Sequence, residues 1–286
     1  MAIWQTTRFS LDLTRPLVMG IVNNTPDSFS DGGRHHGIAA ALQHAEKLLK
    51  DGAHILDIGG ESTRPGSPVV PEEEELQRVL PVVQEAVRFG VPISVDTNKA
   101  AVMQAVLDAG ADIINDIWAL RQPGAQAVVA DHPNCGIVLM HMHKTPLDMQ
   151  VQPMGGDPVP QVLDFLQQQT QALRDLGVDA ARIVWDYGIG FGKSVAQNFA
   201  LLARQRELLG TEFPLLAGWS RKSSLGQVCD LPVQERMLPS VAAALLAVER
   251  GARIVRVHDV AETVTALRVW QAMHDNDIWH TTRQTP

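Results

Sequence analysis

The chain has 286 residues, of which 45% are hydrophobic and 20% charged, and its formal net charge at pH 7 is −8. This composition is ordinary for a globular protein with a full core, and the negative charge argues against nucleic acid as the main partner. No apolar run approaches the ~20 residues that a membrane span needs, and the N-terminal segment lacks the pattern of a secretory signal. The two cysteines, Cys135 and Cys229, exclude a disulfide framework. We therefore expect a cytoplasmic protein without a membrane or nucleic-acid partner.

Short apolar runs alternate with helical patterns after a small N-terminal segment. Residues 3–15 are typical of a two-stranded hairpin, which we expect to cap one end of the fold. The apolar runs predict strands at 18–22, 54–58, 92–95, 113–114, 135–140, 182–185, 214–217 and 253–257. The helical patterns predict helices at 39–49, 72–87, 99–109, 125–131, 160–176, 197–209, 241–249 and 261–273.

Regular alternation of strand and helix predicts a parallel sheet, and eight such units close it into a (β/α)8 TIM barrel of the α/β class. A doubly wound open sheet is the alternative. However, the segment VNNTPDS after the first buried strand is not the GxGxxG phosphate fingerprint of that fold. We predict a single domain over residues 1–286, with 1–16 as the capping hairpin and 276–286 as a disordered tail.

Polar side chains stand at the carboxyl ends of the predicted strands, where a barrel of this kind builds its active face. They are Asn23, Asp57, Thr63, Arg64, Asp96, Asn115, His141, Asp186, Ser220, Arg221, Lys222, Arg256 and His258. A single polar group at a strand end is most often a cap, and we interpret Ser94, Asp116 and Asp259 in that way. So many polar strand ends favour a ligand site instead. Its acceptors suit the N–H groups of a flat heterocycle, and its cations suit a phosphate-like group.

Other chemistries find no support in the sequence. Cysteine and histidine do not occur at the spacing of a zinc site, and we interpret His143 as an exposed loop residue. Ser28 and Ser220 lack the context of a nucleophile elbow, and no acidic pair stands out as a glycosidase dyad. The sequence thus predicts a barrel enzyme that acts on a phosphorylated heterocycle.

Eight segments, in order and each at a predicted strand end, resemble the signatures of one family, the dihydropteroate synthases of folate biosynthesis. The segments are MGIVNNTPDSFSDGG (19–33), DIGGESTRPG (57–66), SVDT (94–97), IIND (113–116), LMHM (139–142), GFGK (190–193), SRKS (220–223) and IVRVHD (254–259). The resemblance covers the chain from residue 18 to about residue 269. It implies the pterin-binding TIM barrel of that family.

The resemblance also implies a reaction and its residues. The enzyme would condense 6-hydroxymethyl-7,8-dihydropterin pyrophosphate with 4-aminobenzoate, giving 7,8-dihydropteroate and pyrophosphate, with Mg²⁺ as cofactor. The implied pterin-binding residues are Asp96, Asn115, Met140, Asp186, Lys222 and Arg256. The implied pyrophosphate-binding residues are Asn23, Arg64, Arg256 and His258, with Asn23 also the metal ligand. The implied 4-aminobenzoate pocket is Thr63, Pro65, Phe191, Ser220 and Lys222, and the implied catalytic residues are Arg64, Lys222, Arg256 and His258.

Assembly, loop closure and inhibition follow from the same resemblance. It implies a homodimer formed through later helices such as 241–246, loops 24–36 and 59–71 that close over the substrates, and inhibition by sulfonamides as 4-aminobenzoate mimics. Two alternatives share a pterin site: a methyltetrahydrofolate-binding domain and a non-catalytic pterin-binding paralogue. The first would not need SFSDGG, SRKS or the pair Arg256 and His258, and the second would be expected to lose pyrophosphate or lysine contacts.

The sequence departs from the usual family pattern at several positions near these segments. They are Asn24, His143, Lys144, Tyr187, Ile189 and Trp219, with Tyr187 in the place of a common proline. None of these positions is an implied ligand. We expect the departures to affect loop shape and sulfonamide affinity more than the reaction.

Overall fold

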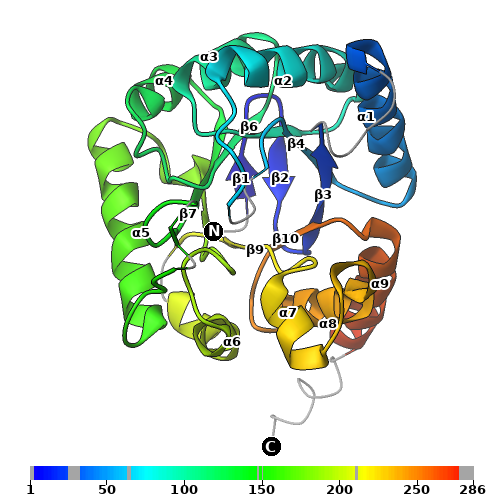
Figure 1. Ribbon diagram of the computed structural model, residues 1–286, viewed down its shortest axis with the longest axis vertical. Coiled ribbons are helices and arrows are strands. Elements are labelled where there is room, and N and C mark those ends of the chain that lie inside the picture. The colour runs from blue at the N-terminus through cyan, green and yellow to red at the C-terminus, as the bar shows by residue number, and fades with distance from the viewer. Residues whose placement is uncertain are drawn as a thin grey trace, which may run out of the picture.

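Eight parallel strands close into a barrel in the computed structural model, and helices surround it (Figure 1). The structure describes residues 3–24, 33–62, 66–146, 148–149, 151–209 and 212–276, and for 33–36 it describes the backbone alone. The order around the barrel is β10-β3-β4-β5-β6-β7-β8-β9. The barrel strands are β3 (Leu17–Asn23), β4 (Ile55–Gly59), β5 (Ile93–Asp96), β6 (Ile113–Asp116), β7 (Gly136–Met140), β8 (Ile183–Asp186), β9 (Leu215–Ala217) and β10 (Ile254–Val257). The predicted (β/α)8 barrel is confirmed.

Helices follow the barrel strands and cover their outer faces. The α-helices are α1 (Gly33–Lys50), α2 (Glu72–Ala86), α3 (Ala100–Asp108), α4 (Ala125–Asp131), α5 (Pro158–Asp175), α6 (Val195–Ala203), α7 (Ser223–Cys229), α8 (Met237–Glu249) and α9 (Val260–Asp275). Short 3₁₀ turns are η2 (Val87–Phe89), η3 (Ala180–Arg182), η4 (Gln205–Leu208) and η5 (Val233–Glu235). Within the described ranges, no helix has the length and hydrophobicity needed to cross a membrane.

Four helices differ from the sequence prediction, and one of them, α8, begins at Met237 and not at residue 241. Helix α1 begins at Gly33 and not at residue 39, and the helix predicted at 197–209 is divided into α6 and η4. Helix α7 has no predicted counterpart. Its segment SSLGQVC is too short to show an apolar periodicity, so only its tertiary packing identifies it as a helix.

Strand parity decides which side chains face the barrel interior, because successive residues of a strand point to opposite faces. One buried interior layer is Met19, Ile55, Ile113, Val138, Val184, Leu216 and Ile254. A residue two positions further along each strand faces the same interior, nearer the carboxyl end. This rule brings Asp57, Asn115, Met140, Asp186 and Arg256 to one rim.

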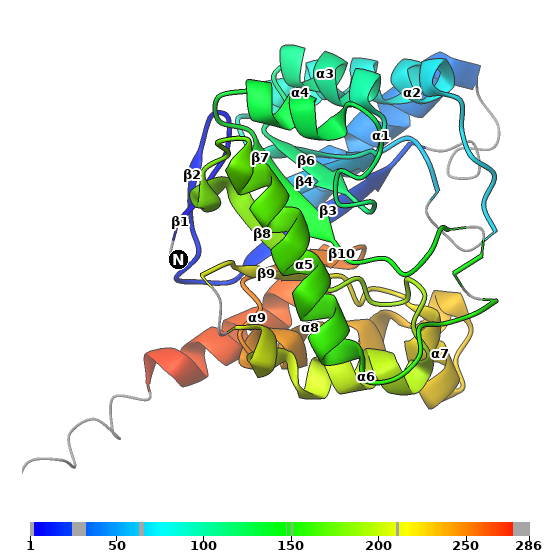
Figure 2. The same ribbon diagram turned by 90° about the vertical axis from the view of Figure 1, so that its left-hand side faces the viewer.

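The N-terminal hairpin covers the other end of the barrel. Strands β1 (Ile3–Gln5) and β2 (Ser10–Asp12) pair antiparallel and lie at one end of the strands (Figure 2). Trp4 is 0% exposed and packs with the apolar interior layer. Its indole N–H donates to the carbonyl of Arg182 at 2.9 Å. The hairpin therefore closes the end of the barrel that lies opposite the polar rim.

Replacing Trp4 with alanine should lower the free energy of unfolding by about 3–5 kcal/mol, because the substitution leaves a cavity at the barrel end. Urea unfolding measures the change. Trp270→Ala is the matched control, since that indole is only partly buried on α9 and bonds to Glu249. A loss below about 0.5 kcal/mol in Trp4→Ala, the size of an ordinary surface change, would contradict the closing role of the hairpin.

Candidate active site

Buried hydrogen-bond acceptors meet at the carboxyl-terminal rim of the barrel. Asp96 ends β5, Asn115 lies in β6 and Asp186 ends β8, and they are 8%, 4% and 6% exposed. Burial raises the pKa of both carboxyl groups. Met140, at the end of β7, is buried beside them. The rim thus offers acceptors around an apolar side chain, and N–H donors from a ligand would relieve the cost of burying the carboxylates.

Arg256, on β10, joins two carboxylates of the rim. Its Nε donates to Oδ2 of Asp57 at 2.6 Å, and its Nη2 donates to Oδ2 of Asp96 at 2.7 Å. Burial opposes the charge of the guanidinium, but Asp57 and Asp96 outweigh burial and raise the pKa of Arg256. Arg256 is therefore a permanent cation at the rim.

Asp57 belongs to the site although the resemblance implies no role for it. Its carboxylate is 0% exposed and accepts hydrogen bonds from Oγ of Ser94 at 2.6 Å and from Nδ2 of Asn115 at 3.3 Å, in addition to Arg256. The prediction that Ser94 is a loop cap is wrong, because strand parity turns its hydroxyl into the barrel and onto Asp57.

Lys222 immediately precedes α7 and reaches the same rim. Its ammonium lies over the ring of Phe191, 4.2 Å from the ring centroid. Burial lowers the pKa of Lys222 to about 8, and the Asp186 carboxylate opposes this effect. Gly190 leaves room for the lysine, because a Cβ at that position would lie 3.2 Å from Cδ of Lys222. The structure therefore brings together a predicted pterin-binding carboxylate and two predicted 4-aminobenzoate-binding residues.

Ser220 and His258, which the sequence assigns to different substrates, contact each other in the structure. The serine Oγ lies 2.9 Å from Nδ1 of His258 and accepts a hydrogen bond from the backbone N–H of His258 at 3.1 Å. The neighbouring Arg221 donates to both oxygens of Asp259, with Nη2 and Oδ1 2.6 Å apart. The prediction that Asp259 is a cap is wrong for its side chain, because Arg221 occupies both carboxylate oxygens.

Three further residues at strand ends take structural roles. Asp116 accepts hydrogen bonds from two loop N–H groups at 2.8 and 2.7 Å, as predicted for a cap. His141 is 5% exposed and meets the ring of Phe165 edge-on at 5.0 Å, so it packs against α5 and does not reach the rim. The prediction that His143 is exposed is also wrong, because the loop at Gly192 packs against it and leaves it only partly exposed.

Lys193 holds the loop that carries Phe191. Its ammonium is buried and donates to the carbonyl of Gly188 at 2.8 Å and to those of His141 and Phe191 at 3.3 Å. Burial lowers the pKa of Lys193 to about 7. The GFGK segment marks this lysine in the sequence, but the sequence does not reveal its carbonyl partners.

Two departures from the family pattern, Tyr187 and Trp219, form one buried hydrogen-bonded chain. The hydroxyl of Tyr187 donates to Oε1 of Gln205 at 2.8 Å and accepts a bond from Nε1 of Trp219 at 3.2 Å. Ile189 is buried in the same apolar cluster, which lies between the barrel and the helices. These departures therefore fill the core and do not contact the rim.

Several predicted site residues lie outside the described residues: Thr63, Arg64 and Pro65, with residues 25–32 of the first signature and 277–286 of the tail. The predicted closure of loops 24–36 and 59–71 stays a prediction. The described ends of the two loops are joined. Asn24 donates through Nδ2 to the carbonyl of Arg78 at 2.7 Å, and Arg78 donates through Nη1 to the carbonyl of Gly60 at 2.8 Å.

Asn23 is the predicted metal ligand, and it lies at the end of β3 with its side chain partly buried. In the part of the chain that the structure describes, no group of three or more His, Cys, Asp or Glu side chains could hold a metal ion. Mg²⁺ does not require such a group, because substrate phosphates and water can supply most of its oxygen ligands. A single amide oxygen at the rim fits a cation held in that way.

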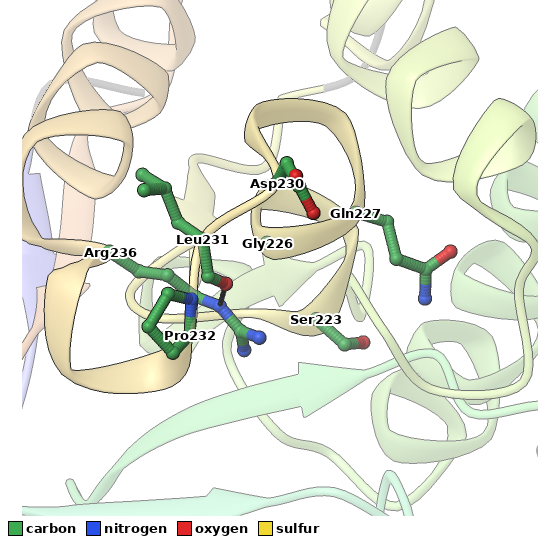
Figure 3. A pocket seen from close by; sticks show the side chains of 7 residues that line it. All are labelled: Ser223, Gly226, Gln227, Asp230, Leu231, Pro232 and Arg236. Atoms are coloured by element: carbon green, nitrogen blue, oxygen red, sulfur yellow. Dashed lines mark hydrogen bonds between the residues drawn. The ribbon is translucent and has the colours of Figure 1, made fainter.

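A pocket of about 400 Å³ lies beside α7 (Figure 3). Its lining residues are Ser223, Gly226, Gln227, Asp230, Leu231, Pro232 and Arg236. The guanidinium of Arg236 donates through Nε to the carbonyl of Leu231 at 3.0 Å and through Nη1 to that of Arg221 at 3.3 Å. Arg236 thus ties the connection between α7 and α8, and the lining includes no predicted site residue.

The chain thus forms a closed barrel with buried acceptors and cations at its carboxyl-terminal rim. The family model described as pterin binding enzyme matches residues 19–258. The chain is 50% identical over 266 residues to the dihydropteroate synthase of Haemophilus influenzae. The matched residues cover 92% of this chain and 95% of that protein.

Solved structures agree with this class. The Burkholderia cenocepacia dihydropteroate synthase complexed with 7,8-dihydropteroate is 52% identical, with a TM-score of 0.88 over 96% of this chain and 97% of that one. The Yersinia pestis enzyme with a sulfonamide drug complex is 47% identical, with a TM-score of 0.90 over 96% of this chain and 99% of that one. The chain belongs to the dihydropteroate synthases, transferases of folate biosynthesis.

Proposed function

We propose that the rim condenses 6-hydroxymethyl-7,8-dihydropterin pyrophosphate with 4-aminobenzoate, releasing 7,8-dihydropteroate and pyrophosphate. The observation that carries the proposal is the meeting of Asp96, Asn115 and Asp186 with Arg256 and Lys222 at one end of the barrel. Family membership and the relative that holds the product, 7,8-dihydropteroate, support it.

The acceptors bind the pterin edge. Its ring N–H and amino groups donate to Asp96, Asn115 and Asp186, and Lys222 donates to the ring carbonyl. Met140 provides an apolar contact for the ring. Hydrogen bonds to buried carboxylates are charge-assisted, so they contribute more to affinity than bonds between neutral groups.

The cations stabilise the leaving group. The bond between the methylene carbon and the pyrophosphate oxygen breaks, and its electron pair leaves with the oxygen. Arg256 neutralises the growing charge, His258 donates a hydrogen bond to the pyrophosphate, and Arg64, outside the described residues, is proposed to join them. The methylene cation is delocalised into the pterin, where the carboxylates favour it.

The aryl amine then attacks that carbon with its lone pair and releases a proton. No general base is required, because the amine is already neutral.

Magnesium is proposed as the cofactor, with Asn23 as its ligand from the chain. When bound, Mg²⁺ would neutralise charge on the departing pyrophosphate. The support is the chemistry of the donor: one amide oxygen at the rim suits a cation that keeps water and phosphate ligands.

The second substrate is proposed to lie beside Phe191, Ser220 and Lys222, with Thr63 and Pro65 completing its pocket. The ammonium of Lys222 and the ring of Phe191 lie together, which suits an aromatic carboxylate. Sulfonamides should compete there. They are expected to raise the KM for 4-aminobenzoate without changing kcat, and a fall in kcat at unchanged KM would contradict this placement.

The experiment that tests the proposed function measures pyrophosphate release from the pterin pyrophosphate, with and without 4-aminobenzoate, in magnesium buffer. Release coupled to dihydropteroate formation, and lost on chelation of the metal, is the expected result. Pterin binding without release would identify a non-catalytic pterin-binding protein instead. Release that persists after chelation would remove magnesium from the proposal.

We also propose a cytoplasmic homodimer. Large apolar side chains on α7, α8 and the turn between them are exposed, with Val228 at 60%, Leu238 at 72% and Leu246 at 45%. Such a surface favours association with a second copy of the chain. Light scattering should give the mass of a dimer, and Leu238→Glu should shift it toward the monomer. A monomeric wild-type protein would overturn the proposal.

The rate should fall as the pH rises through about 8, the value to which burial lowers the pKa of Lys222. The ammonium is present below that pH and lost above it, so kcat/KM for the pterin substrate declines on the alkaline side. The residual activity of Lys222→Ala should lack this decline. If the decline persists in that variant, another group causes it, and Lys193, with its lowered pKa, is the first to test.

A further inference from the structure

We propose that Asp57 is a positioning residue of the reaction, which holds Arg256 and Asn115 in their working orientations without touching either substrate. The inference rests on the proposed function, since it takes Arg256 as the pyrophosphate-binding cation and Asn115 as a pterin acceptor.

Asp57 is placed where only protein can reach it. It lies on β4 inside the barrel and is 0% exposed. Three partners from three other strands contact its carboxylate: Ser94 at Oδ1 from β5, Arg256 at Oδ2 from β10, and Asn115 at both oxygens from β6, at 3.4 and 3.3 Å. A carboxylate held in this way cannot rotate to serve a ligand, so its effect passes through its partners.

The two carboxylates that hold Arg256 are not equivalent. Asp57 is enclosed, whereas Asp96 is 8% exposed at the rim. When the N–H groups of a pterin bind Asp96, they compete with Nη2 of Arg256 for that carboxylate, whereas the bond from Nε to the enclosed Asp57 is unaffected. The guanidinium then remains at the rim with its outer N–H groups available to pyrophosphate oxygens.

Asp57 also decides how Asn115 is oriented. An ionised carboxylate only accepts hydrogen bonds, so the side-chain NH₂ of Asn115 faces Asp57 and its oxygen faces the other way. Asn115 therefore presents an acceptor to the ligand. Asp57 in this way sets one acceptor for the pterin edge and one cation for the leaving group.

The test is Asp57→Asn, which keeps the side-chain volume and removes the charge. We expect kcat to fall about 10- to 100-fold, the size of effect that a misplaced catalytic group produces. The inhibition constant of added inorganic pyrophosphate should rise about 10-fold, while the KM for 4-aminobenzoate should stay within about 2-fold. A fall in kcat with unchanged pyrophosphate inhibition would overturn the inference, because it would point to general damage.

Two further variants keep the test decisive. Asp116→Asn is the matched control: that carboxylate is equally buried but caps loop N–H groups, so the melting temperature should fall while kcat does not. Ser94→Ala removes the hydroxyl donor to Asp57 and should lower kcat in the same direction, by about 3- to 10-fold. If Asp57→Asn fails to fold, an unchanged kcat in Ser94→Ala overturns the inference.

Arg256→Ala separates this inference from the proposed function. If Arg256→Ala leaves kcat and pyrophosphate inhibition unchanged, the proposed role of Arg256 fails. If Arg256→Ala loses both and Asp57→Asn loses neither, only the inference fails. In the double variant the losses should not add, because Asp57 acts on pyrophosphate through Arg256.

Discussion

Replacing Lys222 with alanine is expected to lower kcat by about 10²- to 10³-fold, the size of effect seen when one buried charged donor is removed from a reacting site. The ammonium of Lys222 lies over the ring of Phe191, and the neighbouring Asp186 favours its charge. The fold should be retained. Although Lys222 precedes α7, its side chain makes no capping hydrogen bond to that helix.

Steady-state turnover and thermal melting, followed by circular dichroism, together test this expectation. Lys47→Ala is the control, because that lysine is exposed on α1 and paired with Asp51. Its kcat should match that of the wild type. If Lys222→Ala turns over within about threefold of the wild type, our description of the rim as the active site is wrong.

Replacing Asp186 with alanine should abolish measurable pterin binding. Hydrogen bonds to charged groups contribute about 1.5–3 kcal/mol each, so losing a carboxylate that accepts two of them weakens binding by at least two orders of magnitude. Isothermal titration calorimetry with the pterin pyrophosphate measures the change. Asp164→Ala, on the exposed face of α5, is the control and should leave the affinity unchanged.

Asp186 also accepts the backbone N–H of Gly188 at 2.7 Å, so alanine could disturb the loop that follows β8. Asp186→Asn retains an oxygen for that N–H and removes only the charge. It should still bind the pterin more weakly than the wild type. Unchanged affinity in the asparagine variant would show that the charge of Asp186 does not bind the ligand.

The sequence predicts the barrel well because its strands are short, wholly buried apolar runs that end in polar groups. Helix α7 escapes prediction because its short segment carries no periodic signal. The strand ends identify Asp96, Asn115 and Asp186 as candidate site residues without any knowledge of register. The strand ends do not distinguish Asp57 and Ser94, which face the barrel interior, from Asp116, which caps loop N–H groups. That distinction depends on which face of the sheet each residue occupies.

Long-range partners are the other part that sequence reasoning misses. The carbonyl groups that hold Lys193 and the hydroxyl that joins Trp219 to Gln205 come together only when the loops fold over the barrel. Arg256 is the same kind of case. The sequence shows that residue 256 is basic and lies near the end of a strand. It does not show the two carboxylate partners, which are 199 and 160 residues away.

The chain formed by Tyr187, Trp219 and Gln205 has a consequence for how this enzyme can change. Restoring the proline common in the family at position 187 would remove the hydroxyl that serves both partners. A buried indole N–H and a buried amide oxygen would then be unpaired, at about 1–3 kcal/mol each. We therefore expect the three positions to vary together among relatives, because a change at one of them alone gives a less stable protein. Consensus design from relatives should exchange all three together.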